Sequence, residues 1–157
     1  MIRPVTGLTL TGSASYLDSK VDRYSGISVF GVATDFAGSR LPFAPKWTLS
    51  GDLDYRISTS GGGTAFFGAS VSYRSSVDTY VGGSTLAIPS NGVNRWVRRV
   101  PFMIDGYALV DGRIGYEFPG ERLTLSAWGK NIFNKYYVDN IISYNDIITQ
   151  AVGQPAS

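Results

Sequence analysis

The sequence predicts an all-β fold, specifically an antiparallel transmembrane β-barrel, of which this chain supplies about five strands. Three observations lead to this prediction. Five segments alternate apolar and polar residues with a period of two, and none shows a 3.6-residue period over a comparable length. The polar sides of these segments carry many charges, and the connections between segments are short and long in turn.

The five segments are residues 8–16, 47–57, 65–74, 108–118 and 123–127. In each, Leu, Val, Ile, Ala, Gly and aromatic residues occupy one face, whereas Thr, Ser and charged residues occupy the other. The charged residues assigned to the inward face, some of them just beyond a segment, are Asp52, Asp54, Arg56, Arg74, Asp111, Arg113, Glu117 and Lys130. Because such a face would make a poor dry core, we expect these groups to form cross-strand ion pairs along a wet lumen.

Strand length also favours a membrane. The alternating segment 47–57 is eleven residues long, whereas strands of soluble proteins are usually ~5–6 residues long. At ~3.3 Å per residue and a tilt of ~45°, such a strand rises roughly 25 Å, which is the height of the apolar band on an outer-membrane barrel. Aromatic residues lie near the ends of the apolar faces, where interfacial girdles occur: Tyr16, Trp47, Tyr55, Tyr73, Tyr116 and Phe118.

The connections fall into two classes. TSGGG at 59–63 and PGER at 119–122 are tight turns, whereas residues 21–45 and 81–103 form long connections. Short turns at one end and long loops at the other are typical of a bacterial outer-membrane barrel, with turns in the periplasm and loops outside. A soluble lipocalin-like barrel or β-sandwich would also alternate, so it stays open as the alternative fold.

The composition limits the function. The chain has 157 residues with a net charge of +2, which gives no electrostatic indication of a nucleic-acid partner. It contains no Cys and no His, so thiol nucleophiles, disulfides and His-based acid–base chemistry are excluded. No uncharged apolar run approaches the length of a transmembrane helix. We expect neither enzymatic activity nor a cofactor or bound metal.

Three stretches resemble one family in collinear order, over essentially the whole chain. They are VTGLTLTGSASYLDSKV at 5–21, GSRLPFAPKWTLSGDLDYRI at 38–57 and LTLSAWGKNIFNKYYVDN at 123–140. They resemble the C-terminal strands of TonB-dependent outer-membrane receptors. The run NIFNKYY at 131–137 is similar to the penultimate-strand motif of that family.

The resemblance implies energy-coupled import of an iron–siderophore complex, cobalamin or another scarce nutrient. It also implies a barrel of roughly 22 strands filled by an N-terminal plug. Residues 1–157 then look like a C-terminal barrel fragment without the plug, its TonB-coupling box or the closing strand. Expected partners are outer-membrane lipid, lipopolysaccharide, the siderophore or a similar ligand and, through the plug, the TonB system. Alternatives are a porin-like or structural outer-membrane barrel and a soluble ligand-binding barrel.

An open sheet in lipid leaves backbone groups unpaired, at several kcal/mol each. We therefore expect the isolated chain to form no stable monomeric barrel and to transport nothing. Heat-modifiable gel mobility of the refolded chain would contradict this expectation.

The candidate ligand site is in the connection 81–103. Arg95, Arg98 and Arg99 surround Trp96 there with no acidic neighbour. Such a group suits an anionic ligand, for example a ferric siderophore, through charge-assisted hydrogen bonds and stacking. A solvated loop, or contacts to lipopolysaccharide phosphates, is the alternative.

The stretch GKNIFNKYYVDN, residues 129–140, is interpreted as a strand leaving the membrane near Lys130. Asn131, Asn134 and Lys135 are expected at the polar interface. Phe133, Tyr136 and Tyr137 are expected to act there as amphipathic anchors. The following residues, 141–152, are predicted to form a long extracellular loop rather than a helix.

Overall fold

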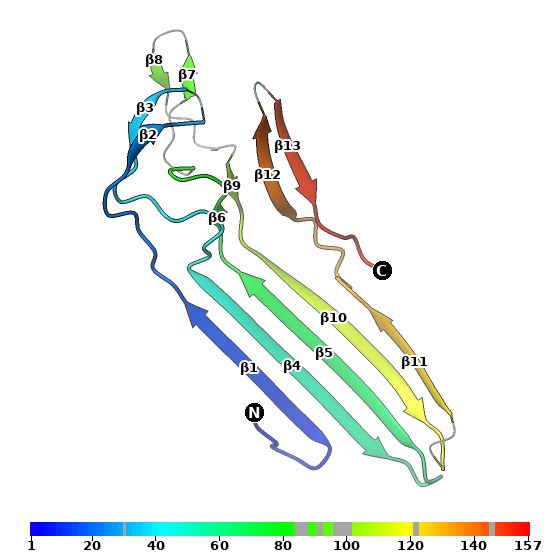
Figure 1. Ribbon diagram of the computed structural model, residues 1–157. Coiled ribbons are helices and arrows are strands. Elements are labelled where there is room, and N and C mark those ends of the chain that lie inside the picture. Colours follow the sequence, from blue (N-terminus) through cyan, green and yellow to red (C-terminus); the bar gives the residue numbers. More distant parts are fainter. Residues whose placement is uncertain (30, 84–87, 91–92, 96–101, 121–122, 145–146) are drawn as a thin grey trace.

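A five-stranded antiparallel sheet forms the wall of the molecule. The computed structural model describes residues 1–29, 31–83, 88–90, 93–95, 102–120, 123–144 and 147–157. The strands of the wall are β1 (Leu8–Tyr16), β4 (Trp47–Ser58), β5 (Thr64–Arg74), β10 (Tyr107–Glu117) and β11 (Thr124–Gly129). They pair in the order β1-β4-β5-β10-β11 (Figure 1). The described residues include no helix long and apolar enough for a membrane span.

The register of the wall places apolar residues opposite apolar residues along every ladder. Leu49 pairs with Ala14 on one side and Tyr73 on the other, and Ile114 lies between Phe67 and Ala127. The apolar face is not covered by protein, because Ile114 is 61% exposed and Leu125 58% exposed. A continuous uncovered apolar face is what a strand surface in contact with lipid requires. The five alternating segments predicted from the sequence are confirmed as the five strands of the wall.

Aromatic pairs mark both ends of the apolar face. The rings of Tyr16 and Trp47 lie 4.7 Å apart where β1 ends and β4 begins. The rings of Tyr116 and Phe118 lie 5.0 Å apart at the opposite end of the wall. These are the two levels at which a membrane barrel places its girdles.

Two short turns lie at one end of the wall. Between β4 and β5 the Thr59 N–H donates to the Gly63 carbonyl at 2.8 Å, and Gly62 has a positive φ of 78° that favours glycine. The β10–β11 turn is closed by the Phe118 N–H and the Leu123 carbonyl at 2.9 Å. All long connections lie at the other end (Figure 1), so the predicted alternation of turns and loops is confirmed.

The long connections contain short hairpins. β2 (Ser25–Ile27) pairs with β3 (Ala33–Asp35), and β6 (Val77–Asp78) pairs with β9 (Met103–Ile104). β7 (Ile88–Ser90) pairs with β8 (Val93–Arg95), and β12 (Val138–Tyr144) pairs with β13 (Ile147–Val152). The stretch 141–152 was predicted as a long extracellular loop rather than a helix, and backbone pairing between two β-branched segments organises it as a hairpin.

The apolar core lies among these loops and outside the wall. Its buried side chains come from three connections that are far apart in the sequence: Phe36, Val77, Phe102, Ile104 and Ile141. Tyr80 packs against this core and its hydroxyl accepts a hydrogen bond from the Ser143 N–H at 3.0 Å. The three connections thus form one packed loop cluster at the end of the wall opposite the short turns.

The sheet is open, with β1 and β11 as its outer strands. Beside β1, Ile2 and Leu10 exchange two backbone hydrogen bonds of 2.8 and 2.9 Å. Beside β11, Lys130 and Ser157 exchange bonds of 2.8 and 3.2 Å. Backbone pairing therefore begins on both outer edges of the sheet.

Candidate functional site: the polar face of the wall

The polar face is arranged in rows that cross the strands. One row contains Thr9, Asp54, Gly68, Arg113 and Trp128, which are successive register partners on the five strands. Because side chains alternate between faces, all members of a row project from the same side of the sheet. The rows near the short turns carry charged residues, whereas those near the loops carry mainly hydroxyl groups on β1, β4 and β5.

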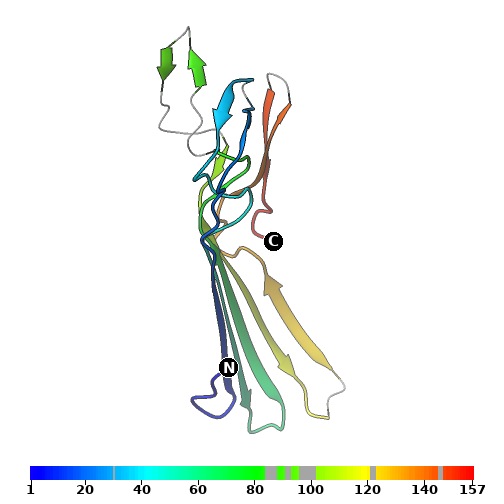
Figure 2. The ribbon, with the colours of Figure 1, turned by 60° about the vertical axis from the view of Figure 1, so that its left-hand side comes forward.

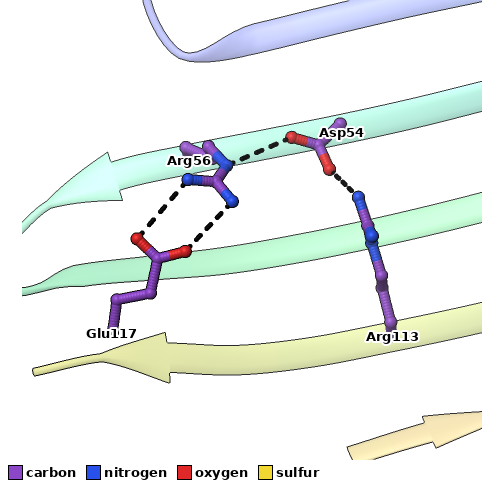
Figure 3. Close-up of polar contacts among 4 residues, drawn as sticks. All are labelled: Asp54, Arg56, Arg113 and Glu117. Carbon is purple, nitrogen blue, oxygen red and sulfur yellow. Dashed lines mark hydrogen bonds and ion pairs between the residues drawn. The ribbon is translucent and has the colours of Figure 1, made fainter. Parts of the chain in front are cut away.

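Four charged side chains form a network near the short turns (Figure 3). Arg56 Nη2 and Nη1 donate to the two Glu117 carboxylate oxygens at 3.1 and 3.4 Å. Arg56 Nε lies 3.6 Å from Asp54 Oδ1, and Arg113 Nη2 donates to the other oxygen of Asp54. Two arginines therefore share two carboxylates in an alternating chain, which confirms the predicted cross-strand pairing for these four residues.

Two glycines make room for this network. Gly68 lies between Asp54 and Arg113 in the register, and a Cβ at this position would come within 2.5 Å of Arg113 Nε. At Gly115 a Cβ would collide with the ring of Phe66. That ring lies under the Arg56 guanidinium, with 5.7 Å from its carbon to the ring centre. Gly68 on β5 lets the Arg113 side chain reach across to Asp54, and Gly115 on β10 leaves room for the Phe66 ring beneath Arg56.

A concavity of about 430 Å³ adjoins the network on the same face. Its polar lining is Asp52, Asp54, Ser70, Asp111, Arg113 and Lys130, with Trp128 at one side. Asp111 accepts a hydrogen bond from the Asn131 N–H at 2.8 Å. Asp52, Asp111 and Lys130 have no ion pair within the part of the chain that the structure describes, so the prediction of pairing does not extend to them.

Asn131 fixes the chain where β11 ends. It is only 4% exposed and has a positive φ of 47°. Its Nδ2 donates to the carbonyls of Lys135 and Gln154 at 3.0 Å each, and its Oδ1 accepts from the Lys135 N–H at 2.8 Å. The sequence interpretation placed Asn131 at the polar interface, which is wrong, because these bonds satisfy the amide inside the protein. Phe133 is 76% exposed, in keeping with an anchor.

A second junction, which the sequence interpretation missed, joins the wall to the β12–β13 hairpin. The Arg74 guanidinium carbon lies 4.7 Å from the centre of the Tyr107 ring. Arg74 Nη2 lies 3.5 Å from the Val138 carbonyl oxygen and 3.9 Å from Asp139 Oδ1. Tyr137, predicted as an interfacial anchor, packs against Tyr107 with ring centres 4.4 Å apart. No spacing in the sequence could indicate these contacts, because they join residues about thirty to sixty positions apart.

The predicted ligand residues lie in and beyond the β7–β8 hairpin. Arg95 is the last residue of β8, and the structure describes its backbone only. Trp96, Arg98 and Arg99 lie outside the described residues. The hairpin stands at the far end of the loop cluster from the wall (Figure 2). The assignment of these four residues to an anionic ligand stays a prediction.

A wall with one lipid-type face and one ion-paired polar face is the arrangement of an outer-membrane barrel. Comparison with known families gives a match to the family described as TonB dependent receptor-like, beta-barrel, over residues 5–132. The chain belongs to this family. The resemblance and the fold class predicted from the sequence are therefore confirmed, and members of this family are outer-membrane proteins.

Comparison with solved structures gives the ferric yersiniabactin uptake receptor FyuA from Yersinia pestis. The TM-score is 0.67 at 16% sequence identity, and the match covers 98% of this chain. At that identity the likeness concerns the fold. The chain spans 20% of the length of FyuA.

Proposed function

We propose that this TonB-dependent receptor barrel chain is the C-terminal part of the barrel of a receptor that imports a scarce nutrient, an iron–siderophore complex. The observation that carries the proposal is the two-faced wall, apolar and uncovered outside and ion-paired inside, in a chain of this family. Such a wall encloses a wet lumen that can hold a plug domain. Energy would come from the TonB system through that plug, and the proposal assigns this chain no chemical reaction.

The ligand class follows from the outer loops. Arg95, Arg98 and Arg99 with Trp96 offer charge-assisted hydrogen bonds and a stacking surface, which suit an anionic ferric complex. FyuA, whose fold this chain resembles, is named for the uptake of ferric yersiniabactin. This supports a ferric siderophore over a neutral nutrient.

A lipopolysaccharide contact is proposed at the loop end of the apolar face. Lys46 Nζ lies 5.4 Å from the centre of the Tyr16 ring, and Tyr16 packs on Trp47. Lysine above an aromatic girdle is suited to the phosphates of outer-leaflet lipid. Asp18 Oδ1 lies 4.0 Å from Lys46 Nζ, and the Lys46 side chain stays partly exposed to solvent.

The test uses the receptor that contains this chain, expressed in cells without their own siderophore receptors. Ferric yersiniabactin and representative ferric catecholates and hydroxamates serve as probes. We expect iron uptake that is abolished when TonB is deleted. Uptake that persists without TonB would indicate a porin-like barrel, and no uptake of any probe would overturn the proposal.

The role of the arginines has its own test. Replacing Arg95, Arg98 and Arg99 by Gln should weaken binding of the transported probe by at least about tenfold, because each lost charge-assisted bond is worth roughly 1.5–3 kcal/mol. The matched control replaces Lys20, Arg23 and Arg40 by Gln, which removes three positive charges from the segment between β1 and β4. Equal affinity losses in the two triple variants would show a general charge effect and no site.

A further inference from the structure

A continuous strip of hydroxyl groups occupies the polar face on the loop side of the ion-pair network. It consists of Thr11, Ser13 and Ser15 on β1, Thr48 and Ser50 on β4, and Ser70 and Ser72 on β5. These residues are direct register partners: Ser13 pairs with Ser50, and Ser50 pairs with Ser72. On β10 the same rows continue with Tyr107, Leu109 and Asp111, so the strip is confined to three adjacent strands.

The strip differs from the rest of the polar face in its charge. Near the short turns, Arg56, Arg113 and their two carboxylates are bound to one another. On β4 and β5 the rows of the strip contain two charged residues, Asp52 and, in the row of Thr48 at the loop end, Arg74. Most of its hydroxyl groups are exposed, including those of Ser15, Thr48 and Ser72.

Hydroxyl groups suit a surface along which a polar solute moves. Each can donate and accept and rotates to suit its partner, so a solute can exchange one hydrogen bond for the next at similar energy. A bond to a fixed charge is worth about 1.5–3 kcal/mol and would retain the solute. An apolar face would instead remove water from the polar groups of the solute without replacing their hydrogen bonds.

The existing contacts within the strip fit this behaviour. In the described part of the chain, a single side-chain hydrogen bond joins two of its members, Ser13 Oγ and Ser50 Oγ at 2.8 Å. Both groups are exposed, so water or a solute can replace this bond at little cost. On β1 the strip runs from Ser15, at the loop end of the strand, to Thr11, the register partner of Asp52.

We propose that this hydroxyl strip is the sector of the lumen wall along which the ligand passes after the domain filling the lumen has moved. The ligand would carry hydrogen-bonding groups on its surface, such as carbonyl, hydroxyl or phenolate groups. The charged network would stay paired and would not bind the ligand. The inference rests on the proposed function and specifies the route within the same barrel.

Single cysteines provide the test, since the chain contains none of its own. In the full receptor, with any cysteines outside this chain replaced by serine, Ser50→Cys and Ser72→Cys place a thiol on the strip. The matched control is Ser126→Cys, which is also an exposed serine on the polar face but lies on β11 outside the strip. Each variant is treated with a bulky membrane-impermeant maleimide, with and without TonB-energised import of the ferric siderophore that the receptor transports.

The strip thiols should react at least about fivefold faster during energised import, because the wall is uncovered only when the lumen opens. Their modification should lower the uptake rate by about tenfold or more while siderophore binding stays unchanged, and modified Ser126→Cys should keep its uptake. The strip is ruled out as the route if Ser50→Cys and Ser72→Cys react equally in both states or keep their uptake after modification. A wild-type receptor that imports no ferric siderophore would overturn the proposed function instead.

Discussion

The wall and the loop cluster are stabilised in opposite ways. In the wall, large apolar side chains such as Ile114 and Leu125 stay exposed, and the strands are held by their backbone ladders. In the loop cluster, Phe36 and Phe102 are buried with other apolar side chains in a small dry core. The two faces of the wall therefore suit lipid on the apolar side and water on the polar side, whereas the loop cluster buries its apolar side chains as soluble domains do.

The difference explains why connections of more than twenty residues pack together here. Loops of that length with no structure of their own are uncommon in compact domains. Here three connections share one core, and the Ser143–Tyr80 hydrogen bond joins the last of them to the second. The hairpin β7–β8, which ends at Arg95 of the predicted ligand residues, is thereby attached to a packed base formed by β6 and β9.

The largest effect is expected in the loop cluster. Phe102 is 0% exposed, so Phe102→Ala should destabilise the cluster by about 3–5 kcal/mol through lost burial and a residual cavity. Amide hydrogen exchange of β6, β9 and β12 in the full receptor measures this. The control is Phe133→Ala, at a side chain 76% exposed, which should change exchange little. Unchanged protection in Phe102→Ala would contradict a shared core.

The wall should respond most strongly to charge on its apolar face. Val71 lies near the middle of β5, and Val71→Arg should cost about 2–4 kcal/mol in a bilayer because the guanidinium would enter hydrocarbon. Ser72→Arg, on the neighbouring residue of the opposite face, should cost much less. Urea unfolding of the receptor in lipid vesicles measures both. Equal losses of stability in the Val71→Arg and Ser72→Arg variants would show that the two faces of the sheet are in contact with the same solvent.

Asn131 tests the junction between the two regions. Asn131→Ala removes its side-chain bonds to Lys135 and Gln154 and leaves buried partners unsatisfied, at about 1–3 kcal/mol. Asn134→Ala is the matched control, since Asn134 also has a positive φ but makes one longer bond, of 3.2 Å, to the Ala156 N–H. Thermal unfolding should separate the two variants, with Asn131→Ala the less stable. The reverse order would contradict the assignment.

The smallest effect is expected for the ion-pair network. Arg56 is about half exposed, so its pair with Glu117 should contribute no more than about 1 kcal/mol after solvent screening. A double-mutant cycle of Arg56→Gln and Glu117→Gln gives the coupling energy, and raised salt should reduce it. A coupling well above this value that does not change with salt would mean that the network is shielded from water in the assembled receptor.

Periodicity was sufficient to predict the wall. Strict alternation over nine to twelve residues determined where strands such as β4 begin and end, because a shift of one residue would move every apolar side chain to the wrong face. The tight turns followed from their glycines and proline. These features depend on neighbouring residues in the sequence and are therefore visible in it.

The loop cluster and the junctions could not be predicted in the same way. Phe36, Val77 and Ile141 meet across more than a hundred residues, and no local pattern indicates that they share a core. Asn131 belongs to a recognised motif, but its burial depends on Gln154, which follows the β12–β13 hairpin. The need for glycine at Gly68 and Gly115 is also invisible in the sequence, because it arises from the side chains of Arg113 and Phe66, which lie over these two positions in the folded sheet.

A scan along β5 is the sharpest test of whether one sheet separates lipid from water in this barrel. Single spin-labelled cysteines at each position from Thr64 to Arg74 of the receptor in bilayers report accessibility to oxygen and to a water-soluble nickel complex. We expect a period of two, with oxygen favoured at Phe67, Ala69 and Val71 and the nickel complex favoured at Gly68, Ser70 and Ser72. Accessibility without alternation, or nickel access on both faces, would contradict it.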